Sequence, residues 1–461
     1  MSIRRYIGDR PFYKRILRVM LPIMAQQGIT SFVSLLDNIM VGRVGTEQMS
    51  GVAISNQLLF IFQLAVFGGL SGAGIFCAQY FGKGDREKVQ SVFRFKLIST
   101  ALITVLAGAV YLIWGPRLIG LFLTDTGDGG DIAATLAYGT QYMRIMLIGH
   151  VPLALAQIYA TTMRETGETV IPMGAGITAV VVNMVFNYLL IFGKLGLPRL
   201  GVAGAAVATV LSRFVEMGLL LFFSVRRREK FSYLIGVYRT LRVPRRLTRE
   251  IIKKGTPLLF NELLFSLGMT VIVQCYSTCG LTAVAAYNIT STVTNFFFLV
   301  SFAMGNSIAI VVGQQLGAGE LEKARDTAGK MIALGAALCA AVSVLLALLS
   351  PLFPRIYNTT EEVRQLAHRL LLVEAAFLTL RAVYMSVYFT LRSGGKSMIT
   401  FIFDSGFTWV VCIPLALCLS RLTDLPLLPM YTAVQAVDVI RTAVGLALVR
   451  KGVWLNNLTE P

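Results

Sequence analysis

Residues 78–88 read AQYFGKGDREK and residues 313–323 read GQQLGAGELEK, and both polar stretches lie between long apolar runs. The two stretches align without a gap at a spacing of 235 residues, close to half of this 461-residue chain, which indicates a duplicated architecture. The identical pairs include Gln79 with Gln314, Gly82 with Gly317 and Gly84 with Gly319. We interpret each copy as a tight turn between helices, because glycine permits a sharp reversal of the backbone. A phosphate-binding loop is the alternative, but no predicted strand precedes either copy.

The repetition extends beyond these turns. Pro22 falls on Pro257 at the same spacing, and MRETGETVIPM at 163–173 falls on LRSGGKSMITF at 391–401 at a spacing of 228 residues. Six helices in each half would give both halves the same topology, related by an axis along the membrane normal and enclosing a central cavity. The predicted parts are an N-terminal lobe (1–225), a basic linker with the start of the next helix (226–256), a C-terminal lobe (252–450) and a tail (451–461).

The composition is that of a membrane protein. Hydrophobic residues make up 55% of the chain and charged residues 14%, whereas soluble domains have about 25% charged residues. Apolar runs without alternation of polar residues favour bundled helices over a transmembrane barrel, so the predicted fold class is all-α with twelve membrane helices. Their approximate ranges are 14–41, 51–79, 94–115, 138–162, 169–192, 202–225, 252–276, 284–314, 328–350, 363–390, 397–420 and 428–449.

The net charge of +18 does not indicate nucleic-acid binding, because the basic residues fall in alternate loops. The longest basic segment is 226–254, which we interpret as a solvated loop, whereas the loop at 124–131 is acidic. The positive-inside rule therefore places both termini in the cytoplasm. No spacing of the six cysteines resembles a zinc site, so we interpret them as small packing residues and expect no metal.

Several motifs resemble the multidrug and toxic compound extrusion (MATE) family. They are LLDNIMVGRVGTEQMSGVAISNQ at 35–57, the two glycine turns, NMVFNYLLIFGKLGLPRLGVAGAAVAT at 183–209 and YFTLRSGGKSMITFIFDSGFTWVVCIPLA at 388–416. The resemblance implies a transporter that exports organic, often cationic, compounds by rocking of two lobes. It would exchange them for H⁺ or Na⁺ and need no cofactor. The style of the loops and the absence of organellar targeting favour the inner membrane of a bacterium, and we expect a monomer. A lipid-linked oligosaccharide flippase of related architecture is the alternative, although this chain stops at twelve predicted spans.

The first predicted helix carries Asp37, and counting depth places it near Asn183, Asn187 and Thr209. An ionisable group inside a membrane is a functional candidate by default, and these oxygen-bearing side chains suit a proton or a small hard cation. In the resembled family the matching acid belongs to the coupling site. Where some members have a second acid this chain has Asn187, which favours protons over sodium. The alternative is that Asp37 only caps its helix.

A second group of charges lies in the C-terminal half, and we predict similar depths for Glu262, Arg381, Asp404 and Asp438. Its members are Glu262, Arg381, Asp404, Asp438 and Arg441. Glu262 matches an acid of the resembled family, whereas Arg381 replaces its acidic partner, so we expect an ion pair between Glu262 and Arg381. The network either binds substrate or breaks during rocking; a fixed structural network is the alternative.

One histidine, His150, lies in the middle of a predicted span and is a candidate proton relay. A lone helix histidine is more often simply hydrogen-bonded, and that interpretation stays open. An intramembrane enzyme is the least favoured class of protein, because no nucleophile lies beside a base and no histidine pair could bind a metal.

Overall fold

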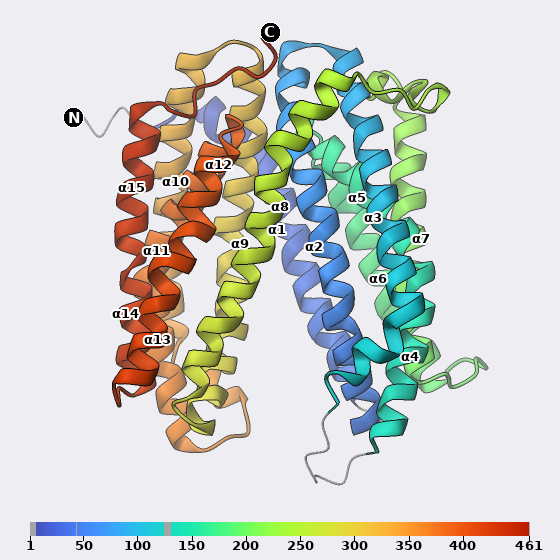
Figure 1. The fold of residues 1–461 in the computed structure, drawn as a ribbon, viewed down its shortest axis with the longest axis vertical. Coiled ribbons are helices and arrows are strands. Elements are labelled where there is room, and N and C mark those ends of the chain that lie inside the picture. Colours follow the sequence, from blue (N-terminus) through green and yellow to red (C-terminus); the bar gives the residue numbers. More distant parts are fainter. Residues whose placement is uncertain (1–5, 43, 124–130, 461) are drawn as a thin grey trace. The chain divides into compact units, whose positions relative to one another are not determined.

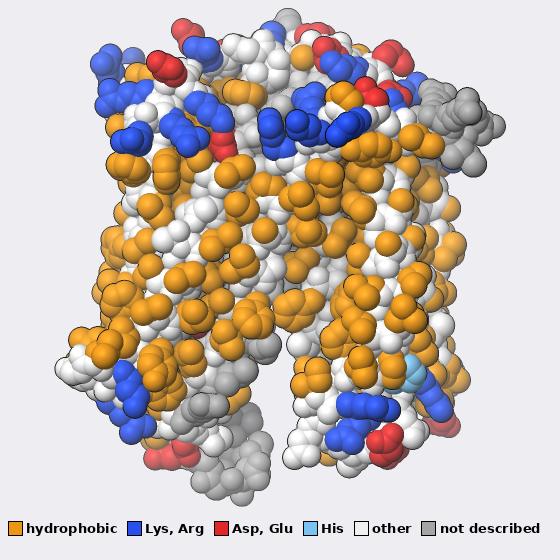
Figure 2. All heavy atoms as spheres, turned by 180° about the vertical axis from the view of Figure 1, so that it is seen from behind, with side chains coloured by type: hydrophobic (Ala, Val, Ile, Leu, Met, Phe, Trp, Pro, Cys, Tyr) orange, Lys and Arg blue, Asp and Glu red, His pale blue; other side chains and the backbone are white. Residues whose placement is uncertain are grey.

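The computed structural model describes residues 6–42, 44–123 and 131–460, and these residues form helices and connecting turns without a β-strand (Figure 1). The all-α prediction is confirmed. The acidic loop expected at 124–131 lies almost wholly outside the described residues. Charged side chains gather at the ends of the helices and hydrophobic side chains cover their middle stretches (Figure 2), as expected for helices that cross a membrane.

Eleven helical spans in the described part of the chain are long and apolar enough to cross a membrane, and a bent helix pair makes a twelfth. The continuous helices are α1 (Arg10–Gly42), α2 (Thr46–Lys83), α3 (Arg86–Gly120), α6 (Val170–Phe192), α7 (Val202–Arg226), α8 (Arg245–Ser277), α9 (Leu281–Gly317), α10 (Leu321–Leu349) and α11 (Glu361–Ser393). The bent pair is α4 (Ile132–Ile148) with α5 (His150–Glu165), at an angle of 49°. The number of predicted helices is therefore confirmed.

The last two spans are interrupted. Residues Ser397–Leu422 comprise α12 (Ser397–Phe401), two π-helical turns, η5 (Ile402–Gly406) and η6 (Thr408–Cys412), and α13 (Ile413–Leu422). Residues Leu427–Lys451 comprise α14 (Leu427–Ala436) and α15 (Asp438–Lys451). π-Helical turns insert an extra residue per turn and are frequent at functional sites.

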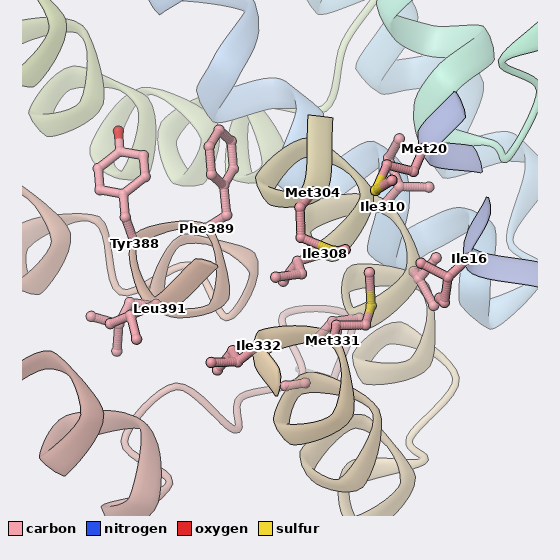
Figure 3. Close-up of a cluster of buried hydrophobic side chains, with 14 of the residues drawn as sticks. Ile16, Met20, Met304, Ile308, Ile310, Met331, Ile332, Tyr388, Phe389 and Leu391 are labelled. Atoms are coloured by element: carbon pink, nitrogen blue, oxygen red, sulfur yellow. The ribbon is translucent and has the colours of Figure 1, made fainter. Parts of the chain in front are cut away.

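The chain divides into two compact units whose bounds depart from the predicted lobes. The N-terminal unit is Ala25–Cys77 with Arg86–Glu250, and the C-terminal unit is Met1–Met24, Ala78–Asp85 and Ile251–Pro461. The start of α1 joins the C-terminal unit because Ile16 and Met20 pack into the core formed by α9, α10 and α11 (Figure 3).

The linker packs against the N-terminal unit, so the interpretation of 226–254 as a solvated loop is wrong for its central part. The short helices η2 (Ser232–Leu234) and η3 (Val237–Arg239) bury Tyr233 and Val237. Gln90 Nε2 donates to the carbonyl oxygen of Ile235 at 2.8 Å, and Arg94 Nε donates to that of Val237 at 3.0 Å. The many basic residues of the linker led us to expect a solvated loop, although its apolar residues Tyr233 and Val237 are buried.

The two glycine turns lie together in the C-terminal unit, at what we call the motif end (79–84 and 314–319). Gly84 and Gly319 have φ angles of +80° and +78°, so the predicted role of these glycines in sharp reversals is confirmed. The tail also packs at this end: the backbone N–H of Leu458 donates to Gln79 Oε1 at 2.7 Å, and Lys83 Nζ donates to the carbonyl oxygen of Thr459 at 2.9 Å.

Candidate functional site

A buried cluster of polar side chains surrounds Asp37 in the N-terminal unit. Asn187 Nδ2 on α6 donates to Asp37 Oδ1 on α1 at 2.7 Å, and Asn183 lies one turn earlier on α6. Asn183 and Asn187 are 6% and 1% exposed, which leaves little room for water to replace these contacts. Thr209 on α7 completes the cluster, because its hydroxyl lies 3.2 Å from the Asn183 amide.

The Asn183 amide fits this cluster in two orientations. In one, Nδ2 donates to Thr209 Oγ1 and Oδ1 accepts from Asn187 Nδ2, each at 3.2 Å. In the other, the amide nitrogen donates to Asp37 Oδ2 at 2.8 Å and to Oδ1 at 3.1 Å. An ionised carboxylate only accepts hydrogen bonds and requires the second orientation, whereas a protonated carboxyl can donate to the amide oxygen in the first. The second orientation pairs both amide atoms of Asn183 beside an ionised Asp37, whereas the first requires a proton on Asp37.

The structure brings together the four residues predicted for this site: Asp37, Asn183, Asn187 and Thr209. The carboxylate of Asp37 binds a side chain of another helix, so capping of α1 does not explain its position. Sequence reasoning missed Tyr142, a buried residue of α4 whose hydroxyl donates to Asn56 Oδ1 at 3.1 Å. A tyrosine in an apolar helix is usually a packing residue, so nothing in the sequence indicated that Tyr142 belongs to a polar cluster.

His150 begins α5 just after the bend at Gly149. Its Nδ1 lies 2.9 Å from the carbonyl oxygen of Met146, and its ring stacks on Phe62 with centroids 4.1 Å apart. Nε2 is buried and has no hydrogen-bond partner among the described residues. These contacts favour a structural role at the helix junction, and a role in proton relay stays a prediction.

Arg381 in the C-terminal unit pairs with Glu374 on the same helix, α11. The two Arg381–Glu374 contacts, from Nη1 to Oε2 and from Nη2 to Oε1, are both 3.2 Å long. Arg381 Nη2 also donates to Gln435 Oε1 at 2.9 Å, and the hydroxyl of Tyr431 donates to Glu374. Glu374 is 2% exposed, and its Oε1 accepts these hydrogen bonds whereas its Oε2 makes none with a described residue.

The predicted ion pair between Glu262 and Arg381 is wrong. Glu262 Oε1 instead lies 3.8 Å from Arg392 Nη1 and accepts a hydrogen bond from Tyr388 at 3.3 Å. Arg392 lies eleven residues beyond Arg381 on α11, about 16 Å along a helix. Counting residues from the helix ends gave Glu262 and Arg381 the same depth. In the structure the middle of α8, which carries Glu262, instead lies beside the end of α11, where Arg392 is one residue before the last.

Asp404 is the centre of the second ionic group, and it lies on the π-helical turn η5. It accepts hydrogen bonds from Asn261 Nδ2 at 2.9 Å, from Arg441 Nη1 at 3.3 Å and from the hydroxyl of Tyr384. Arg441 pairs also with Asp438, and its guanidinium lies 4.1 Å from the centre of the Tyr384 ring. The predicted proximity of Asp404, Asp438 and Arg441 is confirmed.

A short chain of uncharged side chains connects Glu262 to this group. Asn261 Nδ2 donates to the hydroxyl of Tyr388 at 3.2 Å, and Tyr388 donates to Glu262. Both residues were missed from the sequence. The signal was available for one of them, because residues 381, 384, 388 and 392 follow the 3–4 spacing of one helical face.

A partly open cavity of about 300 Å³ lies in the C-terminal unit, and charged, aromatic and sulfur-containing side chains line it. The charged lining residues are Glu374, Arg381, Asp438 and Arg441. The aromatic and sulfur-containing lining residues are Phe265, Met269, Tyr276, Tyr287, Phe298, Tyr384, Met385, Cys412 and Tyr431. Convergent polar groups in a mostly apolar cavity of this size are typical of small-molecule sites.

Twelve apolar spans in the described part of the chain, buried ionisable groups within them and a partly open cavity define the class of protein as a multi-pass membrane transporter. The MatE family model matches residues 22–189 and 257–418, and the chain belongs to this family, the MATE transporters. The predicted family is thus confirmed, and its members named below are transporters rather than enzymes.

The relatives and structures that match this chain agree with that assignment. The chain is 24% identical over 446 residues to the probable multidrug resistance protein NorM of Thermotoga maritima, covering 96% of this chain and 93% of that protein. It is 26% identical to NorM of Halalkalibacterium halodurans over 421 residues, covering 89% and 88%. A solved outward-facing MATE transporter matches with a TM-score of 0.85 and 20% identity, covering 97% of both chains.

Proposed function

We propose that this protein is an antiporter that exports small organic compounds from the cell in exchange for protons, by alternating access of its two halves. The relatives carry the name of multidrug resistance proteins, which supports drug-like compounds as substrates. The basic loops between spans support an inner-membrane orientation with both termini in the cytoplasm.

The observation that carries the proposal is the pairing of Asp37 with two buried asparagines. Asn183 can donate to an ionised Asp37 through its amide nitrogen and could accept from a protonated Asp37 through its amide oxygen, so a hydrogen bond between these two side chains is possible in both protonation states. Proton binding would remove the charge that holds the Asn183 amide in one orientation. That change biases the packing of α1, α6 and α7 and so the equilibrium between the two transport states.

Protons are favoured over sodium as the coupling ion. A hard metal cation needs several oxygen ligands, and carboxylates are usually among them. Asp37 is the sole carboxylate of the four-residue cluster, and its neighbours Asn183, Asn187 and Thr209 are neutral. The cavity of the C-terminal unit, with its enclosed ion pairs, would receive the exported compound.

The test is uptake of ethidium into proteoliposomes under an imposed pH gradient and, separately, under a sodium gradient. Wild-type protein should respond to the pH gradient alone, and Asp37→Asn should reduce the response about tenfold or more. Glu87→Gln, which changes an exposed carboxylate of the same unit, is the matched control and should retain wild-type uptake. Equal uptake by wild type and Asp37→Asn under the pH gradient would overturn proton coupling through Asp37.

A further inference from the structure

We propose that the cavity of the C-terminal unit selects amphoteric aromatic compounds, which carry both a cationic group and a carboxylate, over compounds that carry a cation alone. The inference rests on the proposed function, because it names the class of substrate for that cavity. It depends on the charges, the aromatic wall and an unpartnered hydroxyl of the lining.

The lining has charges of both signs in equal number. Glu374 and Arg381 form one pair and Asp438 and Arg441 form the other. A purely cationic compound would meet two guanidinium groups, and a purely anionic compound would meet two carboxylates. In a low-dielectric interior an uncompensated charge is costly, so a ligand with both charges fits this lining best.

The carboxylates of the lining are already engaged by the protein. Glu374 Oε1 accepts from Arg381, from Gln435 at 2.9 Å and from the hydroxyl of Tyr431. Glu374 Oε2 makes no hydrogen bond with a described residue but lies 3.2 Å from Arg381 Nη1, and Asp438 pairs with Arg441. A cationic ligand would therefore have to compete with a built-in donor at each carboxylate. Among its described lining residues, the cavity thus has no carboxylate free of an arginine partner that could bind a cationic ligand.

Arg381 is the group best placed to receive a ligand carboxylate. Its side chain is 21% exposed, whereas that of Arg441 is 7% exposed and has Asp404 and Asp438 as partners. A guanidinium has five N–H donors in a planar fork that matches a carboxylate. Arg381 can thus bind a ligand carboxylate while it keeps one contact with Glu374.

The wall beside this pair is aromatic. Tyr276 and Tyr431 have ring centroids 5.3 Å apart, and Tyr287 lies 5.5 Å from Tyr276 and 6.2 Å from Tyr431. All three line the cavity, and Tyr431 also contacts Glu374. Aromatic faces bind delocalised organic cations, so the cationic ring system of the ligand would lie against these tyrosines with its carboxylate toward Arg381.

One buried hydroxyl of the lining lacks a partner. Thr294 is 6% exposed, lines the cavity, and its Oγ1 makes no hydrogen bond with a described residue. Buried polar atoms are almost always hydrogen-bonded, so an orphan that lines a cavity indicates a position that a bound molecule satisfies. A bound molecule could therefore form a hydrogen bond with the Thr294 hydroxyl on the side of the cavity formed by α9.

The experiment compares two dyes that differ by one methyl group. Rhodamine 110 carries a delocalised cation and a carboxylate, and rhodamine 123 is its methyl ester and carries the cation alone. Fluorescence anisotropy measures binding of each dye to the full-length protein in lipid nanodiscs at pH 7. We expect wild-type protein to bind rhodamine 110 about tenfold more tightly than rhodamine 123.

Variants assign the preference to the cavity. Arg381→Gln should abolish the preference for rhodamine 110, and the double variant Glu374→Gln with Arg381→Gln should do the same without leaving a buried carboxylate unpaired. Arg325→Gln, at an exposed arginine of the same unit, should keep the preference. If the double variant keeps the full preference, the assignment to Arg381 is overturned.

The two proposals fail separately. Equal binding of both dyes, tighter binding of rhodamine 123, or binding of neither dye by wild-type protein would overturn the amphoteric preference. Proton-driven export is judged independently by ethidium uptake under a pH gradient, which involves no carboxylate on the substrate.

Discussion

The backbone of Gly317 lies so close to that of Gln79 that a β-carbon on Gly317 would be 1.8 Å from the carbonyl oxygen of Gln79. The equivalent residues of the two copies make the reciprocal contact: a β-carbon on Gly82 would be 1.9 Å from the carbonyl oxygen of Gln314. The two copies of the repeated motif therefore pack on each other with glycine against glutamine backbone in both directions. The repeat is a matched pair of close-packing surfaces as well as two turns.

Alanine at either glycine should disrupt this packing. Gly82→Ala and Gly317→Ala would each force backbone apart at the motif end, and we expect a loss of stability of about 1–3 kcal/mol. Thermal unfolding in detergent measures this change. Gly108→Ala is the matched control, because its β-carbon would meet no atom within 4 Å; unchanged stability of Gly317→Ala would contradict the close packing.

A second carboxylate should change the ion selectivity of the Asp37 cluster. Asn187→Asp places an acid within reach of Asp37, because the present Asn187 Nδ2 lies 2.7 Å from Asp37 Oδ1. Two carboxylates suit a hard cation, so we expect sodium-driven ethidium uptake to appear where wild type has none. Asn183→Asp tests the same idea one turn away. No response to sodium in either variant would count against the cluster as the ion site.

Much of the fold and part of the site could be predicted from the sequence. Long uncharged runs such as 263–319 determine the helices, and the four-residue spacing of Asn183 and Asn187 placed both amides on one face of α6. The ion pairs of the C-terminal unit depend on helix tilt and on the π-helical turns around Asp404, which counting along a sequence does not provide. Tyr384 and Tyr388 were missed because tyrosine in an apolar run reads as packing.

The linker should detach from the N-terminal unit in acid. Burial alone would raise the pKa of Glu168, but hydrogen bonds from Lys230 and from the backbone N–H groups of Ile171 and Val170 outweigh it and lower the pKa. A carboxylate with a lowered pKa in the folded state contributes stability above its unfolded pKa, and this contribution is lost as pH falls through the folded pKa.

Hydrogen exchange of residues 228–240 measures that docking. We expect protection in wild-type protein at neutral pH, a loss of this protection below the usual carboxylate range, and reduced protection in Glu168→Gln already at neutral pH. Glu250→Gln, at the other end of the linker, serves as the control. Protection that stays the same in Glu168→Gln at neutral pH would show that Glu168 does not hold the linker.

Removing Arg441 should destabilise the C-terminal unit. Arg441 pairs with both Asp404 and Asp438, so Arg441→Ala would leave two carboxylates without their cation, at a cost of about 3–5 kcal/mol. The triple variant Arg441→Ala with Asp404→Asn and Asp438→Asn removes all three charges, so comparing its thermal unfolding with that of the single variant separates charge burial from packing. A triple variant no more stable than Arg441→Ala would contradict this account of the network.

Proton release on substrate binding tests proton exchange at Asp37 most directly. Ethidium is added to purified full-length protein in weakly buffered solution, and the released protons are counted with a pH-sensitive dye. Antiport through Asp37 predicts release of about one proton per bound ethidium by wild type, and none by an Asp37→Asn variant that still binds the compound. Equal proton release by both proteins, or ethidium binding to wild type without proton release, would contradict the account.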